Sequence, residues 1–256
     1  MRTLLITIVC LLLLLGGAGS VAASGFLDEM ILSSEWWAGE EQQGEIEVFV
    51  LGTYGSESIG TSYHFSLRQD VGQGSIFAVN GALGLDQRMF LNGTFKFGEP
   101  NLYYGFGGLF LVAEGDKLVL LPRLNAGGKF GPERFKLVLD ADFYTLLLVH
   151  GGKLELGIEF VPVTNLRLYG GLYKLFAGSL VTSELVPGTV YQLSAKYETK
   201  PFYLGGEVYF VDEHGAVVSG EAGMNFSFGS LYGRVAAPSQ AAGDFGLYTI
   251  GVRLAY

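Results

Sequence analysis

The chain has 256 residues, of which 49% are hydrophobic and 16% charged, and its formal net charge is −9 at pH 7. This acidic balance argues against nucleic acid as a partner, because a nucleic-acid surface needs clustered lysine and arginine. The single cysteine, Cys10, lies in an apolar N-terminal run that we expect to be removed. The mature chain would then hold no disulfide, thiolate metal site or cysteine nucleophile.

Residues 1–23 have the pattern of a secretory signal peptide. A short positive start at Arg2 precedes an apolar run from Leu4 to Leu15, and Val21-x-Ala23 fits a signal-peptidase site. The run is too short to span a bilayer comfortably. We therefore expect the mature chain to begin near Ser24.

Residues 24–44 do not alternate in hydropathy, and their apolar side chains recur at helix-like spacing. Two adjacent tryptophans are costly to leave in water, so we favour a short helix that docks in or against a barrel over a frayed tail. The docking residues of this plug candidate are Phe26, Leu27, Met30, Ile31, Trp36 and Trp37. The apolar lumen positions that would receive it are Ile76, Leu109, Leu111, Val119 and Leu121.

From residue 45 to the end, apolar and polar residues alternate in short segments separated by turn signals. On one such segment, Leu154, Leu156 and Ile158 share one face, while Glu155 and Glu159 share the other. Such a period of two predicts strands with one apolar and one polar face. We expect an all-β, closed up-and-down antiparallel transmembrane barrel over residues 45–256, with about fourteen strands and twelve as the alternative. The expected strands begin near residues 45, 58, 74, 87, 101, 117, 134, 152, 165, 188, 201, 215, 230 and 244.

The connections between the expected strands are short, with one exception. A longer connection is expected from about Phe176 to Gly188, and a turn at His150-Gly-Gly152. Within each segment the ionisable residues keep to one parity, so the polar face is expected to line the lumen. A soluble sandwich or lipocalin-like barrel would need the opposite arrangement, with an apolar interior. About fourteen strands would also make its interior too wide for side chains to fill.

Charged residues on the expected lumen face fall into three groups. The groups are a basic sector of Arg88, Lys96, Lys117, Arg123, Lys129 and Lys136, an acidic cluster of Asp140, Asp142, Glu155 and Glu159, and an opposing acidic set of Glu198, Glu207 and Glu221. A transverse field between the basic sector and the opposing acidic set would orient polar solutes, although local pairing explains the charges equally well. The four carboxylates of the acidic cluster could hold a hard cation, but an internal salt-bridge ladder, with Arg123 beside Asp140 and Arg167 beside Glu159, is the favoured interpretation.

The chain ends on an alternating strand, Tyr248-Thr-Ile250-Gly-Val252-Arg-Leu254-Ala-Tyr256. This strand resembles the C-terminal strand of bacterial outer-membrane β-barrel proteins. The resemblance implies that Tyr248, Ile250, Val252, Leu254 and Tyr256 form an insertion signal read by the barrel assembly machinery. It also implies a location in the bacterial outer membrane, in contact with outer-membrane lipid.

The pair His64-x-Ser66 is similar to a spacing found in outer-membrane phospholipase and in the lipid A deacylase. In those families the pair faces lipid, whereas here Tyr63 and Phe65 take the apolar face. We therefore expect a polar lumen pair and no catalysis. No cofactor or metal is expected either.

The expected function is a porin-like passive channel for small polar solutes. Two alternatives stay open: transport of a hydrophobic molecule through a plugged barrel, and a closed structural outer-membrane barrel. The extracellular connections look short, which leaves little surface for adhesion.

Overall fold

A computed structural model describes the part of the chain that forms the barrel. The described ranges are 44–55, 62–72, 75–84, 89–99, 101–113, 117–146, 149–179, 185–211, 215–238 and 245–255. The predicted signal peptide, the plug candidate, Arg88 and Tyr256 lie outside these ranges, and so does the side chain of Lys117. Among the described residues, no helix is long and apolar enough to cross a membrane.

Fourteen strands form the described structure, and their starts lie close to those expected from the alternation. Each begins where turn residues end and the period-two pattern resumes. The strands are β1 (Gly44–Gly55), β2 (Ser62–Gly72), β3 (Ser75–Gly84), β4 (Met89–Glu99), β5 (Leu102–Ala113), β6 (Lys117–Phe130), β7 (Phe135–Leu146), β8 (Val149–Val163), β9 (Leu166–Ser179), β10 (Leu185–Thr199), β11 (Phe202–Val211), β12 (Gly215–Phe226), β13 (Gly229–Pro238) and β14 (Phe245–Ala255).

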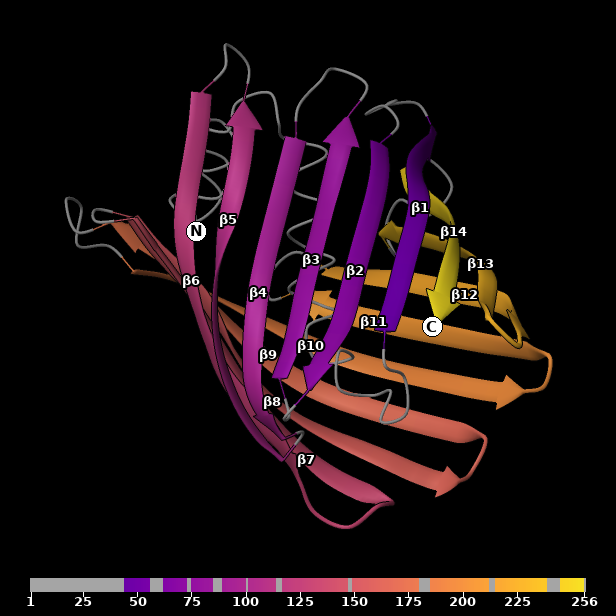
Figure 1. Cartoon of the computed structure of the whole chain (residues 1–256). Helices are drawn as coiled ribbons and strands as arrows, with labels where there is room; N and C mark the ends of the chain where they lie inside the picture. The colour runs from indigo at the N-terminus through magenta and orange to yellow at the C-terminus, as the bar shows by residue number, and fades with distance from the viewer. Residues whose placement is uncertain are drawn as a thin grey trace.

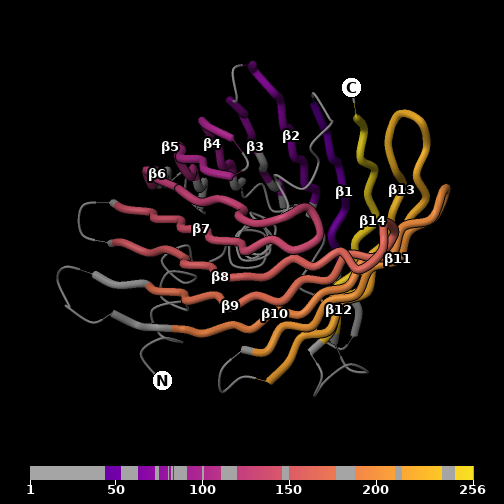
Figure 2. The backbone as a smooth tube through the Cα atoms, turned by 90° about the horizontal axis from the view of Figure 1, so that it is seen from below, coloured from indigo at the N-terminus to yellow at the C-terminus, as the bar shows by residue number. Residues whose placement is uncertain are grey.

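The strands close into one antiparallel barrel in which neighbours in sequence are neighbours in space. The first and last strands complete the ring, since β1 pairs with β14 from Glu45↔Ala255 to Gly55↔Phe245. The indigo β1 lies beside the yellow β14 in Figure 1, and Figure 2 follows the ring from below. The prediction of a closed fourteen-strand up-and-down barrel is confirmed, and the twelve-strand alternative is wrong.

The two faces of the wall differ in the way the alternation predicts. Outward positions carry exposed apolar side chains, such as Leu204 at 61% and Ile250 at 60% exposure, while the inward Arg123 is 1% exposed. Exposed leucine and isoleucine suit a surface that meets hydrocarbon, and buried charge suits a polar interior. The membrane-facing band is therefore outside, and the polar network lies on the lumen wall.

Two expected turns are strand instead. The segment expected as a long connection from Phe176 to Gly188 is largely paired, because β9 continues to Ser179 and β10 starts at Leu185 opposite Gly178. Residues 150–152 likewise belong to β8. Gly152 reads as a turn signal in sequence, yet the ring of Phe176 lies over its Cα and fills the place of a side chain.

Inward tyrosines lie flat against glycines of the neighbouring strand. Tyr203 on β11 faces Gly223 on β12, and a Cβ added at Gly223 would lie 2.3–2.5 Å from two ring carbons and the hydroxyl oxygen of Tyr203. Tyr232 covers Gly251 on β14 in the same way. An aromatic ring over a strand glycine restores the packing that the missing side chain leaves out. These glycines are therefore places where rings approach the backbone.

Replacing Gly223 with alanine is expected to destabilise the barrel by about 1–3 kcal/mol, because the added methyl group displaces the Tyr203 ring. Gly220→Ala on the same strand is the matched control, since a Cβ there meets nothing within 4 Å. Urea unfolding of both variants in detergent micelles measures the difference. Equal urea midpoints for the two variants would show that the Tyr203 ring moves aside without a loss of stability.

Candidate functional site in the barrel lumen

The candidate site is a network of buried polar side chains on the inward face. Inward residues share one parity on each strand, so the barrel brings them onto one continuous wall. The network has two parts, with a relay of hydrogen bonds on β9 to β12 between them. The first cluster, on β4 to β9, consists of Thr94, Lys96, Tyr103, Arg123, Asp140, Asp142, Lys153, Glu155 and Tyr169. The seam cluster, on β1 and β11 to β14, consists of Glu47, Tyr203, Glu221, Tyr232, Arg234 and Arg253.

Arg123 is at the centre of the first cluster. Its Nε lies 2.8 Å from Asp142 Oδ1 and its Nη2 lies 3.0 Å from Asp142 Oδ2, which makes the pair bidentate. Its Nη1 donates to Thr94 Oγ1 at 2.9 Å. The expected neighbour was Asp140, but the register places Asp140 opposite Gly127 and Asp142 opposite Asn125. The ion pair therefore forms one step further along β7 than the sequence suggested.

Two further carboxylates, Glu155 and Asp140, extend the first cluster. Lys153 Nζ lies 3.0 Å from Glu155 Oε2, and both side chains are buried at 1% and 0% exposure. The Tyr169 hydroxyl donates to the other oxygen of Glu155. Asp140 accepts a hydrogen bond from the Tyr103 hydroxyl. Charges removed from water in this way need such partners, since an isolated buried charge is expensive.

A second set of ion pairs lies on the same lumen wall, around Glu159. Lys129 Nζ lies 2.8 Å from Glu159 Oε2, and Arg167 Nε lies 3.6 Å from Glu159 Oε1. Glu159 thus receives one buried cation and one that is 44% exposed. The pairs described here make an internal salt-bridge ladder, and no group of three or more His, Cys, Asp or Glu among the described residues could hold a metal ion.

A few polar atoms on this wall make no hydrogen bond to another protein group. They are both amide atoms of Asn92, both amide atoms of Asn125, and Oδ1 of Asp140. Buried amides normally find partners, so these groups are a part of the wall whose hydrogen-bonding capacity the protein itself does not use.

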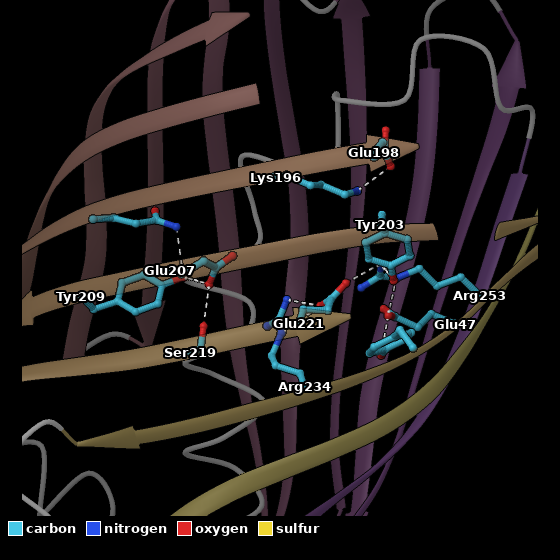
Figure 3. A network of polar contacts seen from close by, with 12 residues as sticks. Glu47, Lys196, Glu198, Tyr203, Glu207, Tyr209, Ser219, Glu221, Arg234 and Arg253 are labelled. Carbon is cyan, nitrogen blue, oxygen red and sulfur yellow. Dashed lines mark hydrogen bonds and ion pairs between the residues drawn. The ribbon is translucent and has the colours of Figure 1, made fainter. Parts of the chain in front are cut away.

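A relay of hydroxyl and amide groups runs across β9 to β12, between the two clusters. The Tyr173 hydroxyl donates to Gln192 Oε1, and Gln192 Nε2 donates to the Tyr209 hydroxyl at 3.0 Å. Tyr209 in turn donates to Glu207 Oε2 at 2.6 Å, and Figure 3 shows this carboxylate between Tyr209 and Ser219. Strands β9 to β12 are therefore connected by side chains as well as by backbone pairing.

The seam cluster ties the first strand to the last four. Arg253 on β14 lies 2.8 Å from Glu47 on β1 and 3.2 Å from Glu221 on β12. Arg234 on β13 lies 2.8 Å from Glu221, and the Tyr232 hydroxyl donates to Glu47 at 2.7 Å. Figure 3 shows Arg253 directed at Glu47, Tyr203 and Glu221 across the place where the barrel closes.

Cations stack over several inward tyrosine rings. Lys96 Nζ lies 4.5 Å from the Tyr103 ring centroid, Lys196 Nζ lies 5.0 Å from that of Tyr203, and the Arg253 guanidinium lies 4.2 Å from that of Tyr232. These distances are within the range of cation–π attraction. The tyrosines thus hold cations flat against the wall.

The expected separation of a basic sector from opposing acids differs from what the structure shows. Arg123 and Lys129 are each paired with a carboxylate of the acidic cluster, so the basic and acidic groups occupy one mixed region. Half-buried Lys136 lies opposite Glu159 in register. On the far side, Glu221 is paired with two arginines, and exposed Glu198 lies 3.1 Å from Lys196. Local pairing, the alternative weighed from the sequence, describes these residues better than a transverse field.

Some inward positions on the lumen wall are apolar. Leu51 on β1, Ile76 and Ala78 on β3 and Leu109 on β5 are buried inward residues. Leu121 is half-buried, while the side chains of Leu111 and Val119 lie outside the described part. These apolar positions therefore lie on β1, β3 and β5 among polar inward residues, since Glu47 on β1 and His64 on β2 also face the lumen.

The His64-x-Ser66 pair points into the lumen, as expected. His64 is 4% exposed and stacks on Phe49 with ring centroids 4.5 Å apart, while Tyr63 and Phe65 are exposed outside. The ring is therefore packed against an aromatic neighbour rather than turned toward lipid.

Sequence reasoning missed part of the site. The inward tyrosines, Gln192, Arg234 and Arg253 were not among the candidates, although each shares the parity of the expected lumen residues on its strand. Arg253 lies on the inward face of the terminal strand, and the apolar residues of the expected insertion signal occupy the opposite face. Those outward residues, Tyr248, Ile250, Val252 and Leu254, are 37–60% exposed on the membrane face.

In sequence, the chain matches no protein family and no curated protein. In structure it is similar to the KdgM porin in complex with disordered oligogalacturonate, with a TM-score of 0.52 and 9% identity over 83% of this chain and 99% of that chain. It is also similar to the KdgM porin alone, with a TM-score of 0.50 and 8% identity over 82% and 99%. The chain has a porin-like outer-membrane β-barrel fold.

CdiB from Acinetobacter baumannii has a comparable likeness, with a TM-score of 0.52 and 10% identity, but this chain covers only 60% of it. At such identities the likeness concerns the fold alone. A porin-like barrel with an apolar outer band implies a location in an outer membrane.

Proposed function

We propose that this protein is a passive channel for small polar solutes that carry little net charge. The observation that carries the proposal is the closed fourteen-strand barrel with a hydrogen-bonded, charge-paired lumen wall. A barrel of this size encloses more space than wall side chains fill, since about eight strands already suffice for a packed interior.

The pairing of lumen charges supports solutes of low net charge. In the first cluster the cations Lys96, Arg123 and Lys153 lie among the carboxylates Asp140, Asp142 and Glu155. Because positive and negative side chains are paired locally, the wall offers hydrogen-bond donors and acceptors without a strong net electrostatic field. The KdgM porin, which shares the fold, was solved with oligogalacturonate. This likeness supports a saccharide-class solute for the present chain, whereas the low net charge rests on the paired wall alone, because each galacturonate unit carries a carboxylate.

Planar-bilayer recordings and liposome swelling with neutral sugars test the proposal. Wild-type protein is expected to give discrete conductance steps with weak ion selectivity, and to admit small sugars faster than large ones. A silent bilayer would favour the closed structural barrel instead.

The buried Lys153–Glu155 pair offers a matched test of the charge argument. Lys153→Gln leaves a carboxylate in excess and is expected to shift selectivity toward cations, whereas Glu155→Gln is expected to shift it toward anions. The double variant is expected to return to the wild-type selectivity. If the ion selectivity of all three variants equals that of wild type, this pair lies off the solute path.

The apolar inward residues Leu51, Ile76, Ala78 and Leu109 favour a second candidate, a transporter for a hydrophobic molecule. That activity would show as uptake of an apolar dye into proteoliposomes without ion conductance. The plug role of residues 24–44, removal of residues 1–23 and the insertion signal remain proposals, with the assembly machinery as the expected partner.

A further inference from the structure

One lysine departs from the parity that the other charged strand residues obey. Inward-facing Tyr173 bonds to Gln192, so the next residue, exposed Lys174, points outward, as do Leu172 and Phe176. In the described strands, the other Lys, Arg, Asp and Glu side chains have the inward parity, except Glu99 at the end of β4. The expectation that ionisable residues keep to one parity within each segment is therefore wrong on β9, and also at Glu99 on β4 and at His150 on β8. A charge on the membrane face needs an explanation, because it costs energy that depends on its depth.

The depth of Lys174 follows from the topology. Strand β9 starts at Leu166, at the end of the barrel that holds the start of β1, the end of β14 and the short turns between β8 and β9 and between β10 and β11. In outer-membrane barrels this end is periplasmic. Lys174 is the ninth residue of β9, just beyond the middle of the strand on the outer-leaflet side, and lies opposite Leu154 on β8. Its long side chain extends along the outer face as far as Thr189, and a lysine stem of this length brings the ammonium group toward the lipid headgroups.

The surroundings of Lys174 combine one polar partner with apolar surface. Its Nζ donates to Thr189 Oγ1 at 2.9 Å, directly across the β9–β10 pairing. Leu154 and Tyr191, beside it on the outer face, are 52% and 51% exposed. Further out, Phe176 stacks on Phe143 with centroids 6.3 Å apart. The ammonium group has three donor hydrogens, and Thr189 accepts one of them.

We propose that Lys174 and Thr189 bind the phosphate of an anionic lipid in the outer leaflet, with its acyl chains along Leu154, Leu172 and Tyr191. An ammonium group pairs strongly with a phosphate oxygen, and a basic residue near a membrane surface favours anionic over zwitterionic headgroups. The site rests on the membrane location of the barrel and not on the proposed channel activity. A failure of the conductance test would therefore leave it standing.

Native mass spectrometry of the full mature protein in detergent micelles tests this site. The micelles are titrated with phosphatidylglycerol or with phosphatidylcholine of the same acyl chains. Wild type is expected to retain one phosphatidylglycerol more tightly than phosphatidylcholine. Lys174→Gln is expected to lose about fivefold in phosphatidylglycerol affinity, while Lys174→Arg keeps most of it.

Lys196→Gln is the matched control, because Lys196 is an exposed lysine of the adjacent strand that faces the lumen and pairs with Glu198. It is expected to bind phosphatidylglycerol as wild type does. Equal phosphatidylglycerol binding by Lys174→Gln and wild type would overturn the proposal, as would equal retention of the two lipids. Binding of glycerol phosphate without acyl chains would indicate a free-anion site instead. A dimer mass lost in Lys174→Gln would assign the surface to a second copy of the chain.

Discussion

Arg123→Met is expected to destabilise the barrel by about 3–5 kcal/mol, because it leaves a buried carboxylate without its cation. Arg123 is 1% exposed and holds both oxygens of Asp142 at 2.8 and 3.0 Å. The change also removes the donor to Thr94. Urea unfolding of folded protein in lipid vesicles measures the loss.

Two further variants separate charge pairing from simple loss of volume. The double variant Arg123→Met with Asp142→Asn is expected to recover much of the stability, since neither charge is then buried alone. Arg167→Met removes a cation that is 44% exposed and 3.6 Å from Glu159, and is expected to cost no more than about 1 kcal/mol. If Arg123→Met and Arg167→Met unfold at the same urea concentration, the first cluster does not depend on its ion pair.

Leu156→Arg is expected to cost about 2–4 kcal/mol, because it places a charge on the membrane face near the middle of the bilayer. Leu156 lies at the centre of β8 and is 49% exposed on the outer face. The variant should also insert into lipid vesicles more slowly than wild type. Unfolding titrations in vesicles give the free-energy difference.

Val163→Arg is the depth control for this change. Val163 is 56% exposed and ends the same strand, where the cost of a charge falls to about 0–1 kcal/mol. Equal destabilisation by the two arginines would mean that depth in the membrane does not set the cost. Equal and negligible effects would contradict the assignment of this face to lipid.

Much of the architecture was accessible from the chain alone because it depends on local pattern. In a barrel wall, alternate residues of each strand face opposite sides. The alternating apolar residues that begin at Phe135 and at Leu154 therefore predicted both the strands and the face that points outward. The even strand number followed from counting these segments. The errors at Phe176–Gly188 and His150–Gly152 arose because glycine breaks strands in most settings. In this barrel, the ring of Phe176 covers Gly152 and lets the strand continue.

The chain by itself therefore determined the fold class, the membrane-facing and lumen-facing parities, and the set of residues from which the lumen is built. Only the tertiary structure decided which of these residues meet. Side-chain partners on a barrel wall depend on the stagger between neighbouring strands, and a shift of one pair of residues exchanges Asp140 for Asp142 as the partner of Arg123. Contacts such as Arg253 with Glu47 join the two ends of the barrel and exist only once it has closed. Period-two alternation carries no information about stagger or closure, which is why these partners could not be read from the sequence.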